Sequence, residues 1–267
     1  MSSNKKIAVA GATGRVGRQL VDVLTRQGHE VVAMSRSTGV DVITKKRLPE
    51  ALAKVECVVD VSSHESPDEQ AATDFFTTAS RNLHEVGQRA GVERMAVVSI
   101  IGCERFTAGY NAAKAKHEQA MRSGPIPVQI LRAGQFHEFV DQLMGWCTQG
   151  DTAYIPEMRT QLVSARTVAE AAADLATQGD ASDGSMIPEI AGPRDENLVE
   201  MATLLARHRG APRTVIGVSD PDDPDRELYQ TGGLLPSAHA KLAGPTFEQW
   251  LESTSDRHAS AEADASA

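Results

Sequence analysis

The stretch Ile7-Ala-Val-Ala-Gly-Ala-Thr-Gly-Arg-Val-Gly17 decides the fold of this chain. Its apolar beginning, residues 7–10, is typical of a buried parallel strand. Three glycines follow at three-residue spacing, and the next apolar residues recur at helical spacing from Val16 to Leu24. A strand, a glycine turn and a helix in this order predict a unit that binds a dinucleotide.

Each glycine of this turn has a separate physical purpose. Gly11 permits a tight turn, Gly14 lets the backbone approach a pyrophosphate, and Gly17 lets the helix pack closely on the strand. The pyrophosphate is then expected on free N–H groups at the positive end of the helix. The alternative is a glycine-rich turn in a similar domain that has lost its ligand. The cofactor-binding residues predicted here are Gly11, Thr13, Gly14, Arg15, Val16 and Gly17.

The end of the second strand predicts which cofactor is bound. This strand, residues 30–34, has Glu30 at its beginning and Ser35 and Arg36 at its end. An acid at the strand end holds the ribose 2′-OH of NAD, whereas an arginine there accepts the 2′-phosphate of NADP. Ser35 and Arg36 therefore favour NADP, with NAD still possible, and Arg15 adds a second positive charge. Both arginines have the alternative of being exposed surface charges.

The following segments continue an alternation of strands and helices. Residues 39–42 predict a short third strand that brings Asp41 to the adenine, and a short helix follows over residues 46–54. Further strands are expected at 56–61, 94–101 and 128–132, with a long helix at 69–90. The end of the strand at 56–61 is expected to place Val61, Ser62 and Ser63 over the cofactor. This alternation predicts an α/β fold with a doubly wound, mainly parallel Rossmann sheet.

A second group of residues follows the strand at 94–101. Tyr110 and Lys114 are four residues apart at the beginning of a helical stretch, so they share one helix face. An ammonium near a phenol lowers the phenol's pKa, and such a tyrosine transfers protons near neutral pH. Ser99, at the strand end, is placed to donate to a substrate oxygen, and Lys114 to hold the nicotinamide ribose. The alternative is an ordinary amphipathic helix.

Together, the turn Gly11-Ala-Thr-Gly-Arg-Val-Gly17 and Tyr110-x-x-x-Lys114 after Ser99 resemble the short-chain dehydrogenase/reductase superfamily. The spelling of the turn is similar to its atypical branch, which includes NmrA-like NAD(P)-binding proteins, and the resemblance covers about residues 5–253. It implies that Tyr110 is the general acid/base, that Lys114 supports it and binds ribose, and that Ser99 orients the carbonyl. It also implies that the segment after the strand at 128–132 lines the substrate pocket, with Gln135, Phe136 and His137.

Composition excludes several other functions. A net charge of −9 over 267 residues argues against a nucleic-acid partner. Three widely spaced cysteines suit a reducing cytosol and form no metal-binding pair. The acidic run at 220–227, with five acids and one arginine, is interpreted as a solvated loop rather than a metal site. Without a signal peptide or a membrane-spanning run, the protein is expected to be cytoplasmic, with no membrane partner.

Three parts of the chain are expected. Residues 1–150 form the NAD(P)-binding core, residues 151–253 a small C-terminal substrate lobe with returning core elements, and residues 254–267 a disordered tail. The first functional hypothesis is an NADP-dependent oxidoreductase acting on a small carbonyl or alcohol, without a metal. The alternatives are an NmrA-like redox sensor without catalysis, or an NAD(P)-dependent epimerase. A small-molecule substrate is the expected partner, and the chain is expected to be a monomer or a homodimer.

Overall fold

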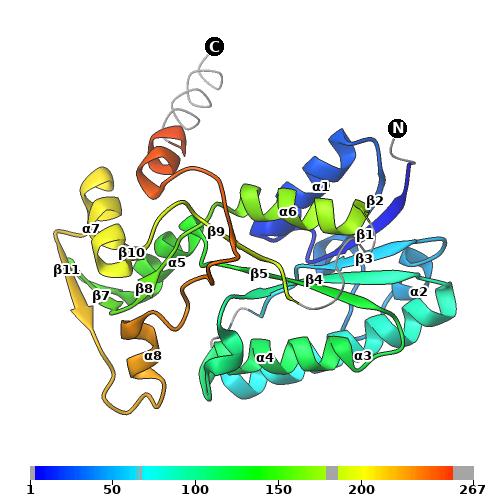
Figure 1. Cartoon of the computed structure of the whole chain (residues 1–267), viewed down its shortest axis with the longest axis horizontal. Helices are drawn as coiled ribbons and strands as arrows, with labels where there is room; N and C mark the ends of the chain where they lie inside the picture. Colours follow the sequence, from blue (N-terminus) through cyan, green and yellow to red (C-terminus); the bar gives the residue numbers. More distant parts are fainter. Residues whose placement is uncertain (1–3, 65, 67, 179–185, 255–267) are drawn as a thin grey trace. The chain divides into compact units, whose positions relative to one another are not determined.

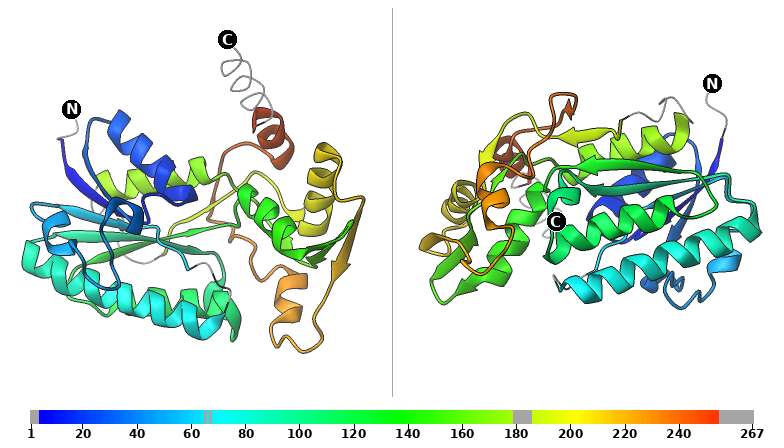
Figure 2. Two further views of the ribbon diagram at one scale, coloured as in Figure 1. Left: turned by 180° about the vertical axis from the view of Figure 1, so that it is seen from behind. Right: turned by 60° about the horizontal axis from the view of Figure 1, so that its bottom comes forward.

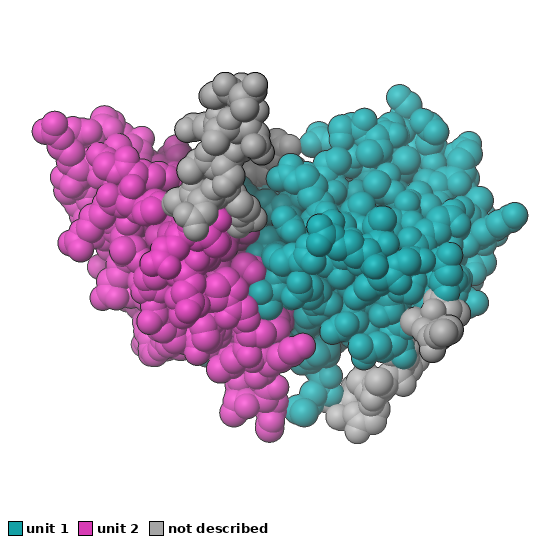
Figure 3. All heavy atoms as spheres, turned by 90° about the horizontal axis from the view of Figure 1, so that it is seen from above, with its two compact units in different colours: residues 1–133, 165–189 teal, residues 134–164, 190–267 magenta. Residues whose placement is uncertain are grey.

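The computed structural model describes residues 4–64, 66, 68–178 and 186–254. Its contacts divide the chain into two compact units, coloured separately in Figure 3. Unit 1 comprises residues 1–133 and 165–189, and unit 2 comprises residues 134–164 and 190–267. The expected domains divided the chain at residue 150, whereas here the chain leaves unit 1 after Ala133 and returns to it at Ala165.

A seven-stranded sheet forms the centre of the fold, in the order β12-β9-β5-β4-β3-β1-β2 (Figure 1). The pairs β1–β2, β1–β3, β3–β4, β4–β5 and β9–β12 are all parallel. The doubly wound Rossmann fold expected from the sequence is thus confirmed. The strands are β1 (Lys6–Ala10), β2 (Glu30–Met34), β3 (Cys57–Asp60), β4 (Arg94–Ile100), β5 (Val128–Ala133), β9 (Glu189–Ala191) and β12 (Lys241–Leu242).

Helices cover both faces of the sheet in unit 1. α1 (Arg15–Arg26) packs with α6 (Ala165–Gln178) on one face, and α3 (Glu69–Ala90) packs with α4 (Gly109–Arg122) on the other (Figures 1 and 2). α3 spans the residues expected for the long helix, because Asp68 caps its N-terminus and Gly91 ends it at a positive φ of 81°. The shorter elements of this unit are η1 (Arg36–Thr38), α2 (Leu48–Ala51) and η2 (Cys103–Arg105).

The strand expected at residues 39–42 does not form, and this prediction was wrong. Ser35 and Thr38 instead cap the short helix η1 reciprocally, and Gly39 ends it at a positive φ of 84°. The backbone N–H of Val40 then turns back to the carbonyl of Ser35. Local side-chain to backbone bonds of this kind compete with strand pairing. β2 is therefore an end strand of the central sheet.

Unit 2 contains two small sheets besides its part of the central one. β11, β7 and β6 form a three-stranded sheet, and β10 pairs with β8. Residues 247–254 are helical, and the predicted tail lies outside the described residues from residue 255 onward. The elements of this unit are α5 (His137–Cys147), β6 (Thr148–Gln149), β7 (Thr152–Pro156), β8 (Arg159–Thr160), β10 (Glu196–Asn197), α7 (Leu198–Arg209), β11 (Thr214–Val218) and α8 (Arg226–Thr231).

Candidate functional site

The glycine turn lies at the point where the strand order of the sheet reverses. From β1 the chain forms β2 on one side and then β3 on the other, with Ala10 of β1 opposite Asp60 of β3. Ligands of doubly wound sheets bind outside the carboxyl ends of the strands at such a reversal. Gly11 and Ser62 follow these two strand ends, and a Cβ on Gly11 would lie 2.7 Å from Ser62 Cα.

The turn fits a pyrophosphate. Gly11 has a φ of +80°, and a Cβ on Gly17 would lie 2.0 Å from the carbonyl oxygen of Gly11, so neither position has room for a side chain. Gly14 is exposed and stands at the N-terminus of α1, where no side chain caps the helix and no acidic residue occupies the first turn. The first turn of α1 is therefore open to an anion.

The remaining predicted cofactor residues near this turn differ in burial. Thr13, Arg15 and Ser63 are exposed, Val61 is half-buried, and Val16 packs in the core. Ser62 is of special interest because its Oγ is buried and has no hydrogen-bond partner in the described part of the chain. A buried hydroxyl without a partner is costly, and a bound ligand beside Gly11 would supply one.

The residues predicted to choose the cofactor lie in the turn after β2. Ser35 is committed locally, since its Oγ accepts the backbone N–H of Thr38. Arg36 is exposed at the first position of η1. Asp41 Oδ1 accepts the backbone N–H groups of Ile43 and Thr44, at 2.8 and 3.3 Å, so one oxygen of this carboxylate already holds a turn.

Tyr110 stands on the first turn of α4 and is half-buried against Ala72, Phe76 and Ala113. Burial raises the pKa of its phenol to about 12, with a smaller contribution from the Asp60 carboxylate. This differs from the lowered pKa that the spacing to Lys114 predicts. The physical reason is the direction of Lys114: among the described residues, no hydrogen bond joins its ammonium to Tyr110.

Lys114 belongs to a buried chain of polar groups. Its Nζ donates to the carbonyl of Val98 at 2.9 Å and lies 3.0 Å from Nδ1 of His117. Because an ammonium only donates, His117 accepts at Nδ1 and donates from Nε2 to Asp60 Oδ2, at 3.2 Å. Phe76 closes the group, stacked on His117 at 4.5 Å and with Lys114 Nζ 4.6 Å from its ring centroid. Lys114, His117 and Asp60 are all buried.

The charges in this buried group of Lys114, His117 and Asp60 are balanced. Burial opposes ionisation of Asp60, yet the hydrogen bond from His117 holds its pKa below the ordinary value. Burial and the neighbouring Lys114 charge lower the pKa of His117, which keeps the imidazole neutral. A neutral imidazole therefore bridges an ammonium and a carboxylate. Asp60 also accepts the backbone N–H of Ser62, which ties this chain to the strand end beside Gly11.

Ser99 enters a second buried group. Its Oγ lies 3.6 Å from Cys103 Sγ, which donates to Glu118 at 3.3 Å. Glu118 in turn accepts two bonds from Arg132, at 2.9 and 2.8 Å. Ser99 is only 3% exposed. The structure thus places Ser99 among these side chains, and its role toward a substrate carbonyl stays a prediction.

Sequence reasoning missed Asp60, His117 and Glu118 in these groups. His117 and Glu118 follow Lys114 by three and four residues, so they occupy the same face of α4. This spacing of three and four residues from Lys114 could have predicted that His117 and Glu118 lie beside it. Asp60 is a carboxylate within an otherwise apolar strand, which is costly without a partner and predicts one.

The three predicted pocket residues belong to unit 2. Gln135 accepts a hydrogen bond from Thr160 at 2.8 Å, and Phe136 bridges to Val163. His137 is fully buried, near the carbonyl of Pro245 at 3.1 Å and the rings of Phe247 and Trp250. Burial lowers the pKa of His137 to about 4. His137 therefore packs in the core of unit 2. A role at the substrate stays a prediction for Gln135, Phe136 and His137.

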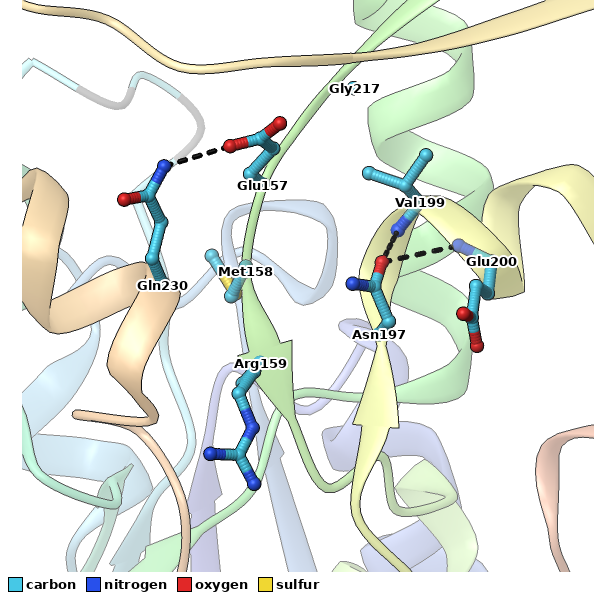
Figure 4. Close-up of a pocket in the computed structure, with 8 residues that line it drawn as sticks. All are labelled: Glu157, Met158, Arg159, Asn197, Val199, Glu200, Gly217 and Gln230. Carbon is cyan, nitrogen blue, oxygen red and sulfur yellow. Dashed lines mark hydrogen bonds between the residues drawn. The ribbon is translucent and has the colours of Figure 1, made fainter.

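A separate hollow of about 690 Å³ lies within unit 2 (Figure 4). Gln230 donates to Glu157 across it at 2.8 Å, and Asn197 caps α7 beside it. It contains none of the predicted site residues, so it is distinct from the dinucleotide turn. Its lining residues are Glu157, Met158, Arg159, Asn197, Val199, Glu200, Gly217 and Gln230.

The described residues contain neither a candidate metal site nor a helix suited to crossing a membrane. No group of three or more His, Cys, Asp or Glu side chains in this part of the chain is placed to hold a metal ion. Within the same residues, no helix combines the length and the apolar character needed to cross a membrane.

Comparison with known proteins agrees with the geometry of the turn. A family model described as NAD(P)H-binding matches residues 11–179. Among curated proteins, the chain is similar to the photosystem II assembly factor Ycf39 of Synechocystis, with 27% identity over 115 residues. That match covers 38% of this chain and 35% of the relative, so it spans about a third of that protein's length.

Solved structures show the same fold. A short-chain dehydrogenase/reductase superfamily protein from Agrobacterium tumefaciens, solved with bound NAD, has 18% identity and a TM-score of 0.66, over 97% of this chain and 99% of that one. The NADPH-dependent quinone oxidoreductase QOR2 from Escherichia coli, solved with NADPH, has 19% identity and a TM-score of 0.64, over 93% and 99%. With the family match running from the glycine turn at residue 11 through α6, the chain belongs to the NAD(P)H-binding family.

Proposed function

We propose that this protein is an NADP-dependent oxidoreductase that acts on the carbonyl or alcohol group of a small molecule. The bound nicotinamide supplies the hydride chemistry. The chain contributes the binding turn, the orientation of the reactants and a proton donor. In this proposal the dinucleotide is held by Gly11, Gly14 and Gly17, with the buried Ser62 hydroxyl as an added donor.

The observation that carries the proposal is the position of Tyr110. It stands on the first turn of α4, the helix that follows β4 in the dinucleotide-binding unit, and its phenol is protonated at neutral pH. A protonated phenol donates to an oxygen that gains negative charge, as a carbonyl does on reduction. The proposal therefore assigns Tyr110 as proton donor in the reducing direction. Lys114 ties α4 to β4 through its hydrogen bond to the carbonyl of Val98.

The preference for NADP rests on two exposed arginines at neighbouring strand ends. Arg15 follows β1 and Arg36 follows β2, and these strands pair in parallel with Ala10 opposite Met34. A guanidinium binds phosphate in a bidentate manner, which supports a role for Arg36 at the 2′-phosphate. Burial opposes ionisation of Asp41, but hydrogen bonds from Ile43 and Thr44 and, to the smallest extent, the charge of Arg36 hold its pKa below the ordinary value.

The experiment is a calorimetric titration of NADPH and NADH, followed by NADPH oxidation with a panel of carbonyl compounds. We expect tighter binding of NADPH, loss of that preference in Arg36→Ala, and loss of turnover with retained binding in Tyr110→Phe. Arg105→Ala is the matched arginine control, because Arg105 is exposed on η2, away from the end of β2. Tighter binding of NADH would overturn the assignment of Arg36.

A second candidate is a redox sensor that binds NAD(P)H without turnover. It is favoured by the direction of Lys114, whose ammonium bonds to Val98 and His117. The similarity to an assembly factor is consistent with it. Tight NADPH binding without oxidation of NADPH by any carbonyl of the panel would select this candidate.

A further inference from the structure

The three-stranded sheet of unit 2 has an open edge. Within the residues that the structure describes, β11 lies at the end of the order β11-β7-β6 and pairs with β7 alone, in parallel (Figures 1 and 2). Edge strands normally carry a proline, a lysine or a bulge that prevents pairing with another chain. Residues 214–218, Thr-Val-Ile-Gly-Val, contain neither a proline nor a charge. Within the strand itself, which Pro212 and Arg213 precede, these protective features are absent.

The backbone groups at this edge can be assigned from the ladder. Thr214 N–H donates to Asp151, and Glu157 N–H donates to the carbonyl of Val218. Since alternate residues of a parallel strand bond to the same neighbour, Thr214 and Val218 face β7. Val215 and Gly217 consequently direct their N–H and C=O groups away from β7, toward the open edge.

One face of the same strand is apolar and exposed. Ile216 is 43% exposed and Val218 36%, and Tyr154, opposite Ile216 on β7, is 39% exposed. The other face is covered, because α7 packs on β11 and β7. An exposed apolar face beside an unprotected edge is typical of a protein interface.

The charges that flank β11 identify the partner. Arg207 and Arg213 precede the strand, with Arg209 between them paired to Asp141, and the acidic run at 220–227 follows it. Two copies paired in parallel would place like charges together. Two copies paired antiparallel would place the basic flank of each beside the acidic flank of the other. Arg213 is available for this, since its side chain is 85% exposed in a long ion pair with Asp151.

We propose that two copies of this chain associate through β11, antiparallel and about a two-fold axis at Ile216. In this register Val215 pairs with Gly217 of the second copy through their outward backbone groups, and each three-stranded sheet continues into the other. Ile216 meets its own symmetry mate, and Thr214 meets Val218. The proposal concerns unit 2 alone and does not depend on the proposed reaction.

Engineered disulfides test the register, in a Cys147→Ser background that retains only the buried Cys57 and Cys103. Residues directly opposite at Ile216 would have Cα atoms about 4.5 Å apart, within reach of a disulfide. We expect Ile216→Cys to form a cross-linked dimer under mild oxidation. Thr214→Cys and Val218→Cys are the matched controls: each alone should remain uncross-linked, whereas an equal mixture of the two should cross-link. Cross-linking of Thr214→Cys to itself would overturn the antiparallel register.

The oligomeric state tests the interface without oxidation. Light scattering over a concentration series should show a monomer–dimer equilibrium in the wild type. Ile216→Lys places two ammonium groups opposite each other at the axis, and should raise the dimer dissociation constant by more than about tenfold. Leu242→Lys makes the same change at a side chain that is 52% exposed on β12, and should leave the equilibrium unchanged. A wild type that stays monomeric throughout, or a dimer indifferent to Ile216→Lys, would refute the proposal.

Discussion

His137 illustrates how much a single side chain depends on its surroundings. In the sequence it is a polar residue after a strand, at a position that the family resemblance led us to expect in a substrate pocket. In the structure its ring is enclosed by Phe247 and Trp250, with Nε2 at the carbonyl of Pro245. The same side chain type at position 117 bridges Lys114 and Asp60. Burial lowers the pKa of both histidines. Each side chain therefore stabilises the folded state only while its imidazole is neutral.

The first prediction concerns pH and stability. The pKa of His137 is about 4 in the folded protein and about 6.5 when unfolded. A group whose pKa is lowered on folding contributes stability above its unfolded pKa and loses it as pH falls. We expect His137→Phe to reduce the loss of unfolding free energy between pH 7 and pH 4.5 by about 2 to 3 kcal/mol. Urea unfolding at both pH values measures this.

The control for this variant is His239→Phe, at an exposed histidine of the same unit. It should leave the pH dependence as it is in the wild type. An equal pH dependence in His137→Phe and the wild type would show that His137 titrates normally in the folded protein.

The second prediction concerns the buried chain that includes Lys114. Asp60→Asn preserves shape but leaves the ammonium of Lys114 without its compensating charge. Breaking a buried ion pair by removing one partner costs about 3 kcal/mol or more. We expect a loss of this size in unfolding free energy at pH 7. Asp22→Asn, an exposed carboxylate bound by Arg26 and Arg166, is the control and should have a small effect. Equal effects of the two substitutions would contradict the account.

At the scale of elements, the turn from β1 into α1 was predictable because its requirements are local. A positive φ and a close backbone contact leave few alternatives to glycine at positions 11 and 17. The long helix α3 was predictable for the same reason, through Asp68 and Gly91. Residues 39–42 were not, since the reciprocal cap between Ser35 and Thr38 converts a strand-like sequence into a turn. Apolar alternation alone does not distinguish these outcomes.

The third prediction separates folding from binding in this turn. Gly17→Ala forces a Cβ within 2.0 Å of the Gly11 carbonyl oxygen, and should cost about 1 to 3 kcal/mol of stability. Gly14→Ala meets the same oxygen only at 3.1 Å and is exposed, so the protein should remain folded. Its methyl group would instead occupy the approach to the pyrophosphate, and NADPH affinity should fall about tenfold or more. Gly14→Ala with unchanged affinity would place the cofactor elsewhere.

At the scale of the whole molecule, the sequence predicted the sheet and its cofactor edge but not the buried partners of the predicted catalytic residues. Tyr110 and Lys114 lie at the expected helix positions, yet the lysine bonds to His117 on its own helix. His117 is itself bonded to Asp60, which lies 57 residues before it on β3. The spacing of residues along one helix does not predict a contact with so distant a residue. The edge of β11 was likewise unforeseen, because no strand was predicted at residues 214–218.

The fourth prediction is that cofactor binding stabilises the protein. A ligand that binds the folded state alone adds about 2.7 kcal/mol at one hundred times its dissociation constant. NADPH at that excess should therefore raise the thermal unfolding midpoint of the wild type by several degrees. Gly14→Ala at the same NADPH concentration should show a smaller rise. An equal rise in both proteins would contradict the role of the turn.

The central claim is hydride transfer from the nicotinamide to a substrate carbon, and isotope transfer tests it most directly. The protein would be incubated with the carbonyl panel and with NADPH that carries deuterium at both C4 positions of the nicotinamide, and the products analysed by mass spectrometry. We predict an alcohol that carries deuterium at the former carbonyl carbon, formed by the wild type and not by Tyr110→Phe. Bound NADPH that transfers no deuterium to any carbonyl would contradict the account and leave the protein as a sensor of its cofactor.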